Sequence, residues 1–174
     1  MKRLKKIAII LIIVTFICFA IGYAIKSQIR LVKSHDRTIQ PCVVDNYIDS
    51  TRLYTIEDVA EYAKETTSAN LTFGWHNEIY NGKANCVGYA QLAAVICNEL
   101  FKRNNIKVKA KPVVGCYYYS NTNIHNMITK FIDNQRIINF IKDHDYVEIV
   151  DSASNVVYSF DPSIYDLTWL DFGE

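Results

Sequence analysis

The sequence around Cys86 is typical of a nucleophilic cysteine. The turn-forming stretch 81–85 precedes it, and an apolar helical pattern begins at it. At a helix N-terminus, unpaired N–H groups and the helix dipole favour the thiolate form of a cysteine. We therefore expect Cys86 to act as a nucleophile if the fold brings a base to it. Without such a base, Cys86 is a packing residue.

The helix that starts at Cys86 is predicted to be buried. The residues that share one face with Cys86 at helical spacing are all apolar: Ala90, Ala93, Ala94, Cys97, Leu100 and Phe101. Most of them are small, so the backbone of another element can approach this face closely. The pattern predicts a central core helix, with Cys97 as one of its core residues.

The clearest hairpin of the chain lies between His144 and Asp161. Its strands are expected over 146–150 and 156–160. Hairpin strands are neighbours, so a histidine entering the first strand and a carboxylate leaving the second should lie side by side. A carboxylate in that position fixes the imidazole tautomer and stabilises the imidazolium. We therefore predict a catalytic triad of Cys86, His144 and Asp161.

Three blocks of the sequence resemble the transglutaminase-like superfamily of papain-like folds. They are Asn85-Cys86-Val87-Gly88-Tyr89-Ala90, His144-Asp145-Tyr146-Val147-Glu148-Ile149 and Tyr158-Ser159-Phe160-Asp161-Pro162-Ser163. The resemblance covers residues 55–165. It implies a cysteine-bearing helix on an antiparallel sheet, with Cys86 as nucleophile, His144 as general base and Asp161 as the orienting carboxylate.

The spacing of the histidines allows a second candidate for the catalytic base. The interval from Cys86 to His144 is longer than the one common in that family, whereas His125 follows Cys86 at a more usual interval. With His125 as base, Asp151 would be the acid. His144 is preferred because the strand after it and the Asp-Pro-Ser block match the family at the right spacing together.

An acyl-transfer site also needs donors for the developing oxyanion. The N–H of Cys86 is expected to be one, and Trp75 and Asn85 are the candidates for a side-chain donor. No pair of Cys or His residues in the sequence has the spacing of a zinc site. The sequence therefore implies neither a metal nor an organic cofactor.

The composition limits the size of the fold and its partners. The chain has 174 residues and a mass of 20.0 kDa, which suits one domain with room for an apolar segment outside it. A net charge of +1 argues against an electrostatic nucleic-acid binder. The partner that we expect is a peptide or protein substrate.

The N-terminal part is predicted to anchor the chain in a membrane. Residues 7–25 carry no charge and are nearly all apolar, which predicts a transmembrane helix or signal anchor after the basic N-terminus 1–6. This order favours a cytoplasmic N-terminus and an extracytoplasmic domain; a cleaved signal peptide and secretion are the alternative. Residues 26–42 are expected to be a linker, and 43–174 the transglutaminase-like domain.

The fold class expected for that domain is α+β. A capping box at 55–58 predicts a helix over 56–65, and the Cys86 helix follows. Strands are expected over 106–110 and 113–119, before the hairpin. In this prediction the papain-like, transglutaminase-like core is preceded by the transmembrane helix.

The function expected from these features is acyl transfer through a thioester on Cys86. With water as acceptor, the chain would be a cysteine protease or amidase, which we favour; with a lysine amine, it would be a crosslinking transglutaminase. The alternative is an inactive, membrane-tethered module of the same fold that binds protein or glycan.

Overall fold

The computed structural model describes residues 28–40, 42, 44–48, 53, 55–131, 133, 138 and 142–168. Its helices are η1 (Asp45–Tyr47), α2 (Ile56–Asn70), α3 (Cys86–Arg103), α4 (Ile124–Ile128) and α6 (Pro162–Thr168). Its strands are β1 (Ile29–Asp36), β2 (Thr72–Phe73), β3 (Lys83–Ala84), β4 (Lys109–Tyr119), β5 (Thr122–Asn123), β6 (His144–Val150) and β7 (Val156–Phe160).

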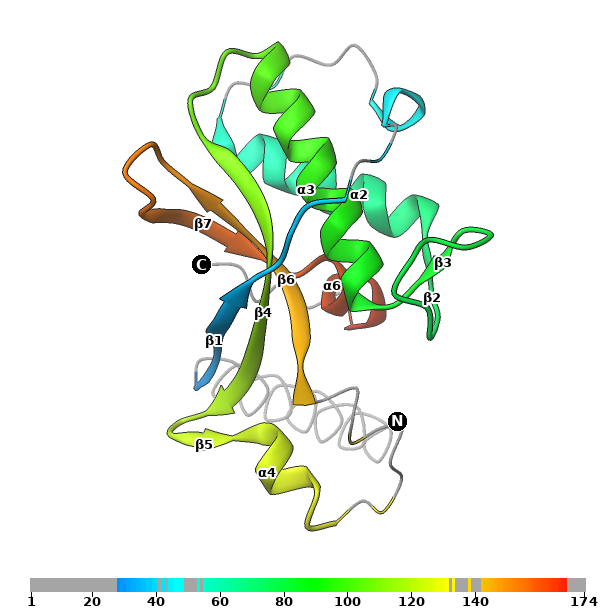
Figure 1. Ribbon diagram of the computed structural model, residues 1–174, viewed down its shortest axis with the longest axis vertical. Helices are drawn as coiled ribbons and strands as arrows, with labels where there is room; N and C mark the ends of the chain where they lie inside the picture. Colours follow the sequence, from blue (N-terminus) through cyan, green and yellow to red (C-terminus); the bar gives the residue numbers. More distant parts are fainter. Residues whose placement is uncertain are drawn as a thin grey trace, which may run out of the picture.

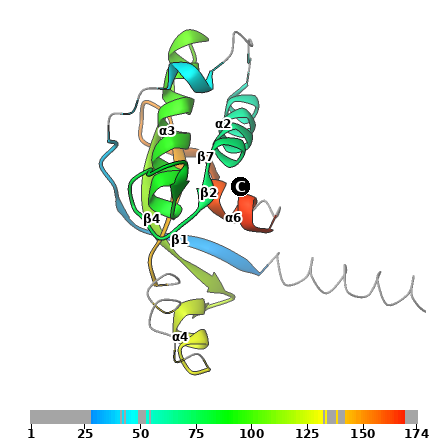
Figure 2. The ribbon, with the colours of Figure 1, turned by 90° about the vertical axis from the view of Figure 1, so that its right-hand side faces the viewer.

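The main sheet is antiparallel and has the strand order β1-β4-β6-β7, with β5 added beside β4. The strands twist strongly, and α2 and α3 lie together beside one half of the sheet (Figure 1). Seen from the side, α3 lies between the sheet and α2 (Figure 2). The helix that begins at Cys86 is therefore central, as the short side chains of its apolar face allow.

The predicted apolar face of α3 is confirmed as core. All six residues of that face are buried: Ala90, Ala93, Ala94, Cys97, Leu100 and Phe101. They join Val147 and Ile149 of β6 in one apolar cluster. Because four of these six side chains are alanine or cysteine and therefore small, the backbone of α3 can lie close to the sheet.

The start of α2 is also confirmed, but its end is not. The Thr55 side chain accepts from the Asp58 N–H and the Asp58 side chain accepts from the Thr55 N–H, which forms the predicted capping box. The helix then continues to Asn70, beyond the predicted end at residue 65. Thr67 is fully buried in this last part, so tertiary packing outweighs the modest helix propensity of 66–70.

The hairpin of β6 and β7 is confirmed, with Val147 opposite Phe160 and Ile149 opposite Tyr158. The two strands expected before it are a single strand, β4, that runs through Pro112. Proline pre-sets an extended backbone and removes only one donor. The Pro112 carbonyl accepts from the Arg37 N–H at 3.0 Å, at the point where pairing with β1 ends.

Strand β1 lies in the stretch that was expected to be a linker. It pairs with β4 from Ile29 opposite Tyr119 to Asp36 opposite Val113, so the folded region begins well before residue 43. Its side chains are mostly polar and exposed, because β1 is an edge strand of the sheet. Backbone pairing and ion pairs such as Lys33–Glu148 hold it, and neither leaves an apolar pattern in the sequence.

The fold prediction needs one correction. It placed a transmembrane helix before the α+β core, but no helix in the described part of the chain is long and apolar enough to cross a membrane. The longest described helix, α3, carries Glu99, Lys102 and Arg103 near its end and is a core helix. The predicted span 7–25 and the basic stretch 1–6 lie outside the described residues.

A side chain of α3 completes the hydrogen bonding of β4, and its removal should be costly. Asn98 Oδ1 accepts from the Ala110 N–H at 2.9 Å, and Asn98 Nδ2 donates to the Ala110 carbonyl at 2.8 Å. Asn98→Ala leaves both backbone groups of the buried Ala110 without this partner, which should lower the free energy of unfolding by about 2 to 4 kcal/mol. Urea denaturation of the full-length chain measures the change.

Asn104→Ala is the matched control for this change. It removes a single hydrogen bond, from Asn104 Nδ2 to the Leu100 carbonyl at the end of α3. We expect a loss below about 1 kcal/mol there. Equal losses in the two variants would contradict the role given to Asn98.

Candidate active site

Cys86 is the first residue of α3, and the chain before it is fixed by several contacts. The Asn85 side chain caps the helix by accepting from the Val87 N–H at 3.0 Å. The Asn85 N–H donates to the His76 carbonyl at 2.7 Å. Gly88 lets the preceding strand pack on the first turn, since a Cβ there would lie 2.4 Å from the Ala84 Cβ. Cys86 itself is only 4% exposed.

His144 is the first residue of β6 and lies opposite Gly115 of β4. The next residue, Asp145, is buried and paired with Arg37 through both carboxylate oxygens, with Arg37 Nη2 to Asp145 Oδ1 at 3.0 Å. This pair anchors the start of β6 and therefore the histidine. Arg37 balances the Asp145 charge, and the carboxylate that contacts the His144 ring is Asp161.

Asp161 connects the end of β7 to the start of α6. The Asp-Pro-Ser sequence explains its position, because aspartate is a preferred N-cap and proline is favoured at the first helical position. Asp161 Oδ1 accepts from the Ser163 N–H, the Ser163 hydroxyl and the Ile164 N–H at 3.0, 2.9 and 3.0 Å. The carboxylate is thus immobilised, and its second oxygen, Oδ2, is presented to the sheet.

The structure brings Cys86, His144 and Asp161 together. The His144 Nε2 atom and Asp161 Oδ2 form a hydrogen-bonded ion pair, and the His144 ring also shares a hydrogen bond with the Cys86 side chain. Since Nε2 is engaged by Asp161, Nδ1 is the ring nitrogen available to the thiol. All three residues are at most 4% exposed, so the contacts lie in a low-dielectric environment.

The electrostatics of the group favour a charged histidine. Burial alone would lower the pKa of His144, but the Asp161 charge and the hydrogen bonds with Asp161 and Cys86 raise it to about 10. Burial alone would raise the pKa of Asp161, and the His144 charge and the hydrogen bonds outweigh this and lower it. At neutral pH the pair is therefore imidazolium and carboxylate.

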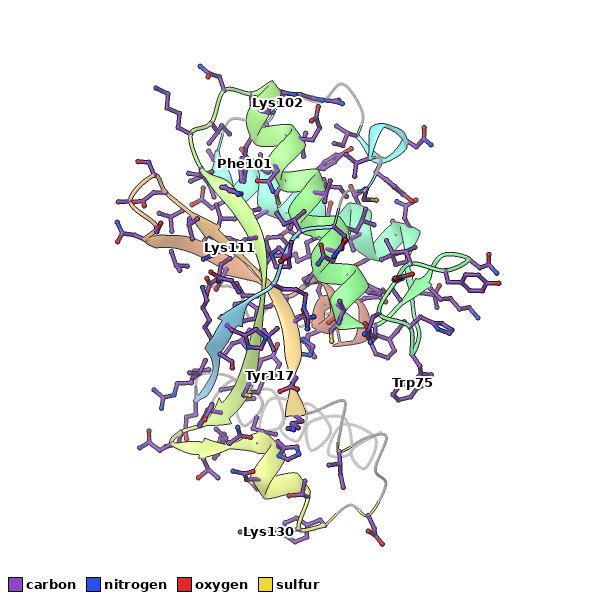
Figure 3. All side chains as sticks on the ribbon, in the orientation of Figure 1. Trp75, Phe101, Lys102, Lys111, Tyr117 and Lys130 are labelled. Carbon is purple, nitrogen blue, oxygen red and sulfur yellow. The ribbon has the colours of Figure 1, made fainter. Side chains whose placement is uncertain are left out.

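Tyr117 of β4 is a fourth member of the group. Its hydroxyl donates to Asp161 Oδ2, the oxygen that His144 uses, and its ring lies 5.2 Å from the His144 ring between centroids. Figure 3 shows Tyr117 on the middle strand of the sheet. Burial, and then the Asp161 charge, raise the pKa of Tyr117, so it remains a neutral donor.

The alternative base and acid lie at opposite ends of β4. His125 belongs to α4, beside β5 and the Tyr119 end of β4 (Figure 1). Asp151 lies in the β6–β7 turn near the Lys109 end, where its carboxylate accepts from the Ala153 and Asn155 N–H groups at 2.9 Å. Eleven residues of strand separate the two ends, roughly 35 Å. The structure does not bring this pair together.

The two candidate oxyanion donors differ in their surroundings. Asn85 Nδ2 donates to Asn77 Oδ1 at 2.7 Å while its oxygen caps α3, so both ends of this amide are engaged. Trp75 is 62% exposed, contacts Phe73 edge-on, and lies at the outer side of the segment between β2 and β3 (Figure 3). An oxyanion donor from Trp75 stays a prediction.

A cleft of about 640 Å³ lies along the first two turns of α3, and Cys86, His144 and Asp161 are not among its lining residues. Its floor is the first two turns of α3 after Cys86, and its walls are the chain after β1 and the loop before β3. The lining residues are Arg37, Thr38, Gln40, Cys42, Asn77, Glu78, Ile79, Val87, Gly88, Gln91 and Leu92. The Gln91 side chain links α3 to the chain after β1. Its Nε2 donates to the Thr38 carbonyl and its Oε1 accepts from the Gln40 N–H, both at 2.9 Å.

Within the described residues, no group of three or more His, Cys, Asp or Glu side chains could hold a metal ion. The chain was then compared with protein-family models, with curated proteins and with solved structures. No match was found in any of the three.

Tyr117 and Ser163 were not among the predicted site residues. Tyr117 lies in the strand expected over 113–119, and Ser163 ends one of the three blocks that carry the family resemblance. The register of β4 against β6 is what places Tyr117 at the site. Once Gly115 lies opposite His144, Tyr117 falls on the same face two residues further along β4.

Proposed function

We propose that this chain is a transglutaminase-like thiol enzyme that cleaves peptide or carboxamide bonds through Cys86. The observation that carries the proposal is the Cys86–His144–Asp161 contact chain, in which a helix cap immobilises the carboxylate. The cleft along the first two turns of α3 has the size of a ligand pocket and starts at Val87, the residue after Cys86. The resemblance of the three sequence blocks points to the same chemistry.

The steps follow from the positions of the protons. In the reactive state the proton of the Cys86 thiol already rests on His144 Nδ1, so the ring is an imidazolium, and a sulfur lone pair attacks the carbonyl carbon while the C=O π pair moves to oxygen. The C–N bond breaks as the oxyanion collapses, and the leaving amine takes the proton from Nδ1. Water then attacks the thioester carbon and gives one proton to Nδ1, and the C–S bond breaks as the acid leaves, which restores the starting pair of sulfur and imidazolium.

An acylation assay on the full-length chain tests this proposal. With p-nitrophenyl acetate in excess, wild type should release a burst of p-nitrophenolate equal to the enzyme concentration, and mass spectrometry should find the acetyl group on Cys86. Cys86→Ala should abolish the burst, whereas Cys116→Ala, which alters a cysteine outside the cleft, should retain it.

The fate of the acyl group separates the two enzyme classes. Added methylamine competes with water for the thioester, so acetate as the main product favours a hydrolase and N-methylacetamide favours a transamidase. A wild-type chain without a burst and without acetylated Cys86 would overturn the proposal and leave a binding module of this fold.

A further inference from the structure

A partly buried tyrosine, Tyr117, touches the acid of the proposed triad but takes no part in the steps above. Tyr117 Oη donates to Asp161 Oδ2, and its ring packs against the ring of His144. The charges and ionisable groups that act on it are Asp161, Cys86 and Tyr146. The Tyr117 hydroxyl donates its hydrogen bond to the Asp161 carboxylate, so it is not a donor for an oxyanion.

The two oxygens of the Asp161 carboxylate accept hydrogen bonds from different elements. Its Oδ1 atom accepts three hydrogen bonds from Ser163 and Ile164 of α6, whereas Oδ2 accepts from two side chains of the sheet, Tyr117 and His144. The α6 contacts fix where the carboxyl group sits. Tyr117 is the second donor on the oxygen that the histidine uses, and it comes from β4, two residues beyond the partner of His144.

From this geometry we infer that Tyr117 is a positioning residue of the proposed acyl-transfer site: its hydroxyl holds Asp161 Oδ2 in line with His144 Nε2, and its ring sets the plane of the imidazole. The inference rests on the proposed function. The hydroxyl also draws charge from Oδ2, so it weakens the pull of the carboxylate on the Nε2 proton.

Two variants separate the hydroxyl from the ring. Tyr117→Phe keeps the ring contact and removes the hydrogen bond, while Tyr117→Leu removes both. Tyr118→Phe is the matched control, because it deletes the same atom from the next residue of β4, whose ring lies 5.9 Å below the Arg30 guanidinium carbon. Far-UV circular dichroism and urea denaturation report whether each variant folds.

Two readouts are made on the full-length chain. For Tyr117→Phe we expect the acylation rate of Cys86 by p-nitrophenyl acetate to fall roughly 10-fold, the equivalent of one lost hydrogen bond to a charged group. The His144 Nε2–H proton resonance in water should move downfield, since Oδ2 now interacts with that proton alone. Tyr117→Leu should lose more activity, and Tyr118→Phe should match wild type in both readouts.

The outcomes distinguish this inference from the proposed function. A folded Tyr117→Phe chain with the wild-type rate and an unmoved resonance would overturn the positioning role while leaving the enzyme intact. Stability loss without a resonance shift would show a merely structural tyrosine and would also overturn it. If wild type itself is not acylated, the proposed function fails, and the resonance shift alone still reports whether Tyr117 acts on the His144–Asp161 pair.

Discussion

Asp161→Asn should lower the acylation rate of Cys86 by about 10² to 10⁴-fold, although the replacement is nearly the same size. The reason is the set of donors around the carboxylate. Oδ1 accepts from two backbone N–H groups, of Ser163 and Ile164, which cannot become acceptors. The asparagine oxygen must therefore take the Oδ1 position, and its NH₂ group must face His144.

An NH₂ group in that position imposes the wrong histidine tautomer. His144 Nε2 has to accept from it, so the neutral ring carries its proton on Nδ1, the nitrogen that is available to Cys86. A protonated Nδ1 on a neutral ring cannot take the thiol proton. The variant keeps its helix cap, so we expect it to fold and to fail in catalysis.

The same burst assay at pH 6.5 measures the loss, and Asp166→Asn is its control. Asp166 lies on the same helix, α6, and accepts from the Tyr89 hydroxyl at 2.6 Å, away from His144. Its replacement should leave the rate within about 3-fold of wild type. If Asp161→Asn is as active as Asp166→Asn, then Asp161 does not set the tautomer of His144.

Local patterns in the sequence were enough to predict several parts of this fold. The Thr55 capping box and the apolar face that follows Cys86 depend on residues within one or two turns of a helix. The β6–β7 hairpin depends on strands separated by a short turn. From these elements the approach of His144 to Asp161 could be expected, because the two residues flank one hairpin.

Other parts depend on contacts between distant segments. Strand β1 forms because β4 offers it a partner, and its polar residues give no periodic signal. Tyr117 reaches Asp161 across 44 positions of the sequence, and only the register of β4 against β6 places it there. The last part of α2 is helical because Thr67 is buried against the rest of the fold. Such features follow from tertiary packing, which overrides local propensity.

The buried His144 should make stability depend on pH, and Cys86→Ala isolates its effect. The pKa of His144 is about 10 in the folded wild-type chain, against 6.5 for an ordinary histidine; in Cys86→Ala the contribution of Cys86 is lost, and the Asp161 charge and hydrogen bond still raise the pKa. Between 6.5 and this raised pKa, the folded state keeps a proton that the unfolded state releases. The free energy of unfolding should therefore be highest below pH 6.5 and fall by up to about 1.4 kcal/mol per pH unit as pH rises towards the folded-state pKa of His144.

Urea denaturation of the full-length Cys86→Ala chain from pH 6 to 9 measures this slope. Adding His144→Gln removes the titrating ring and should flatten it, whereas adding His35→Gln, an exposed histidine of β1, should not. Lys33, Tyr89, Tyr117 and Tyr146 also have a raised pKa, but their ordinary values are 10 or above, so they act beyond this window. Burial also raises the pKa of Cys97, and this thiol adds to the slope only above about pH 8.5, equally in every variant. Equal slopes with and without His144 would contradict the prediction.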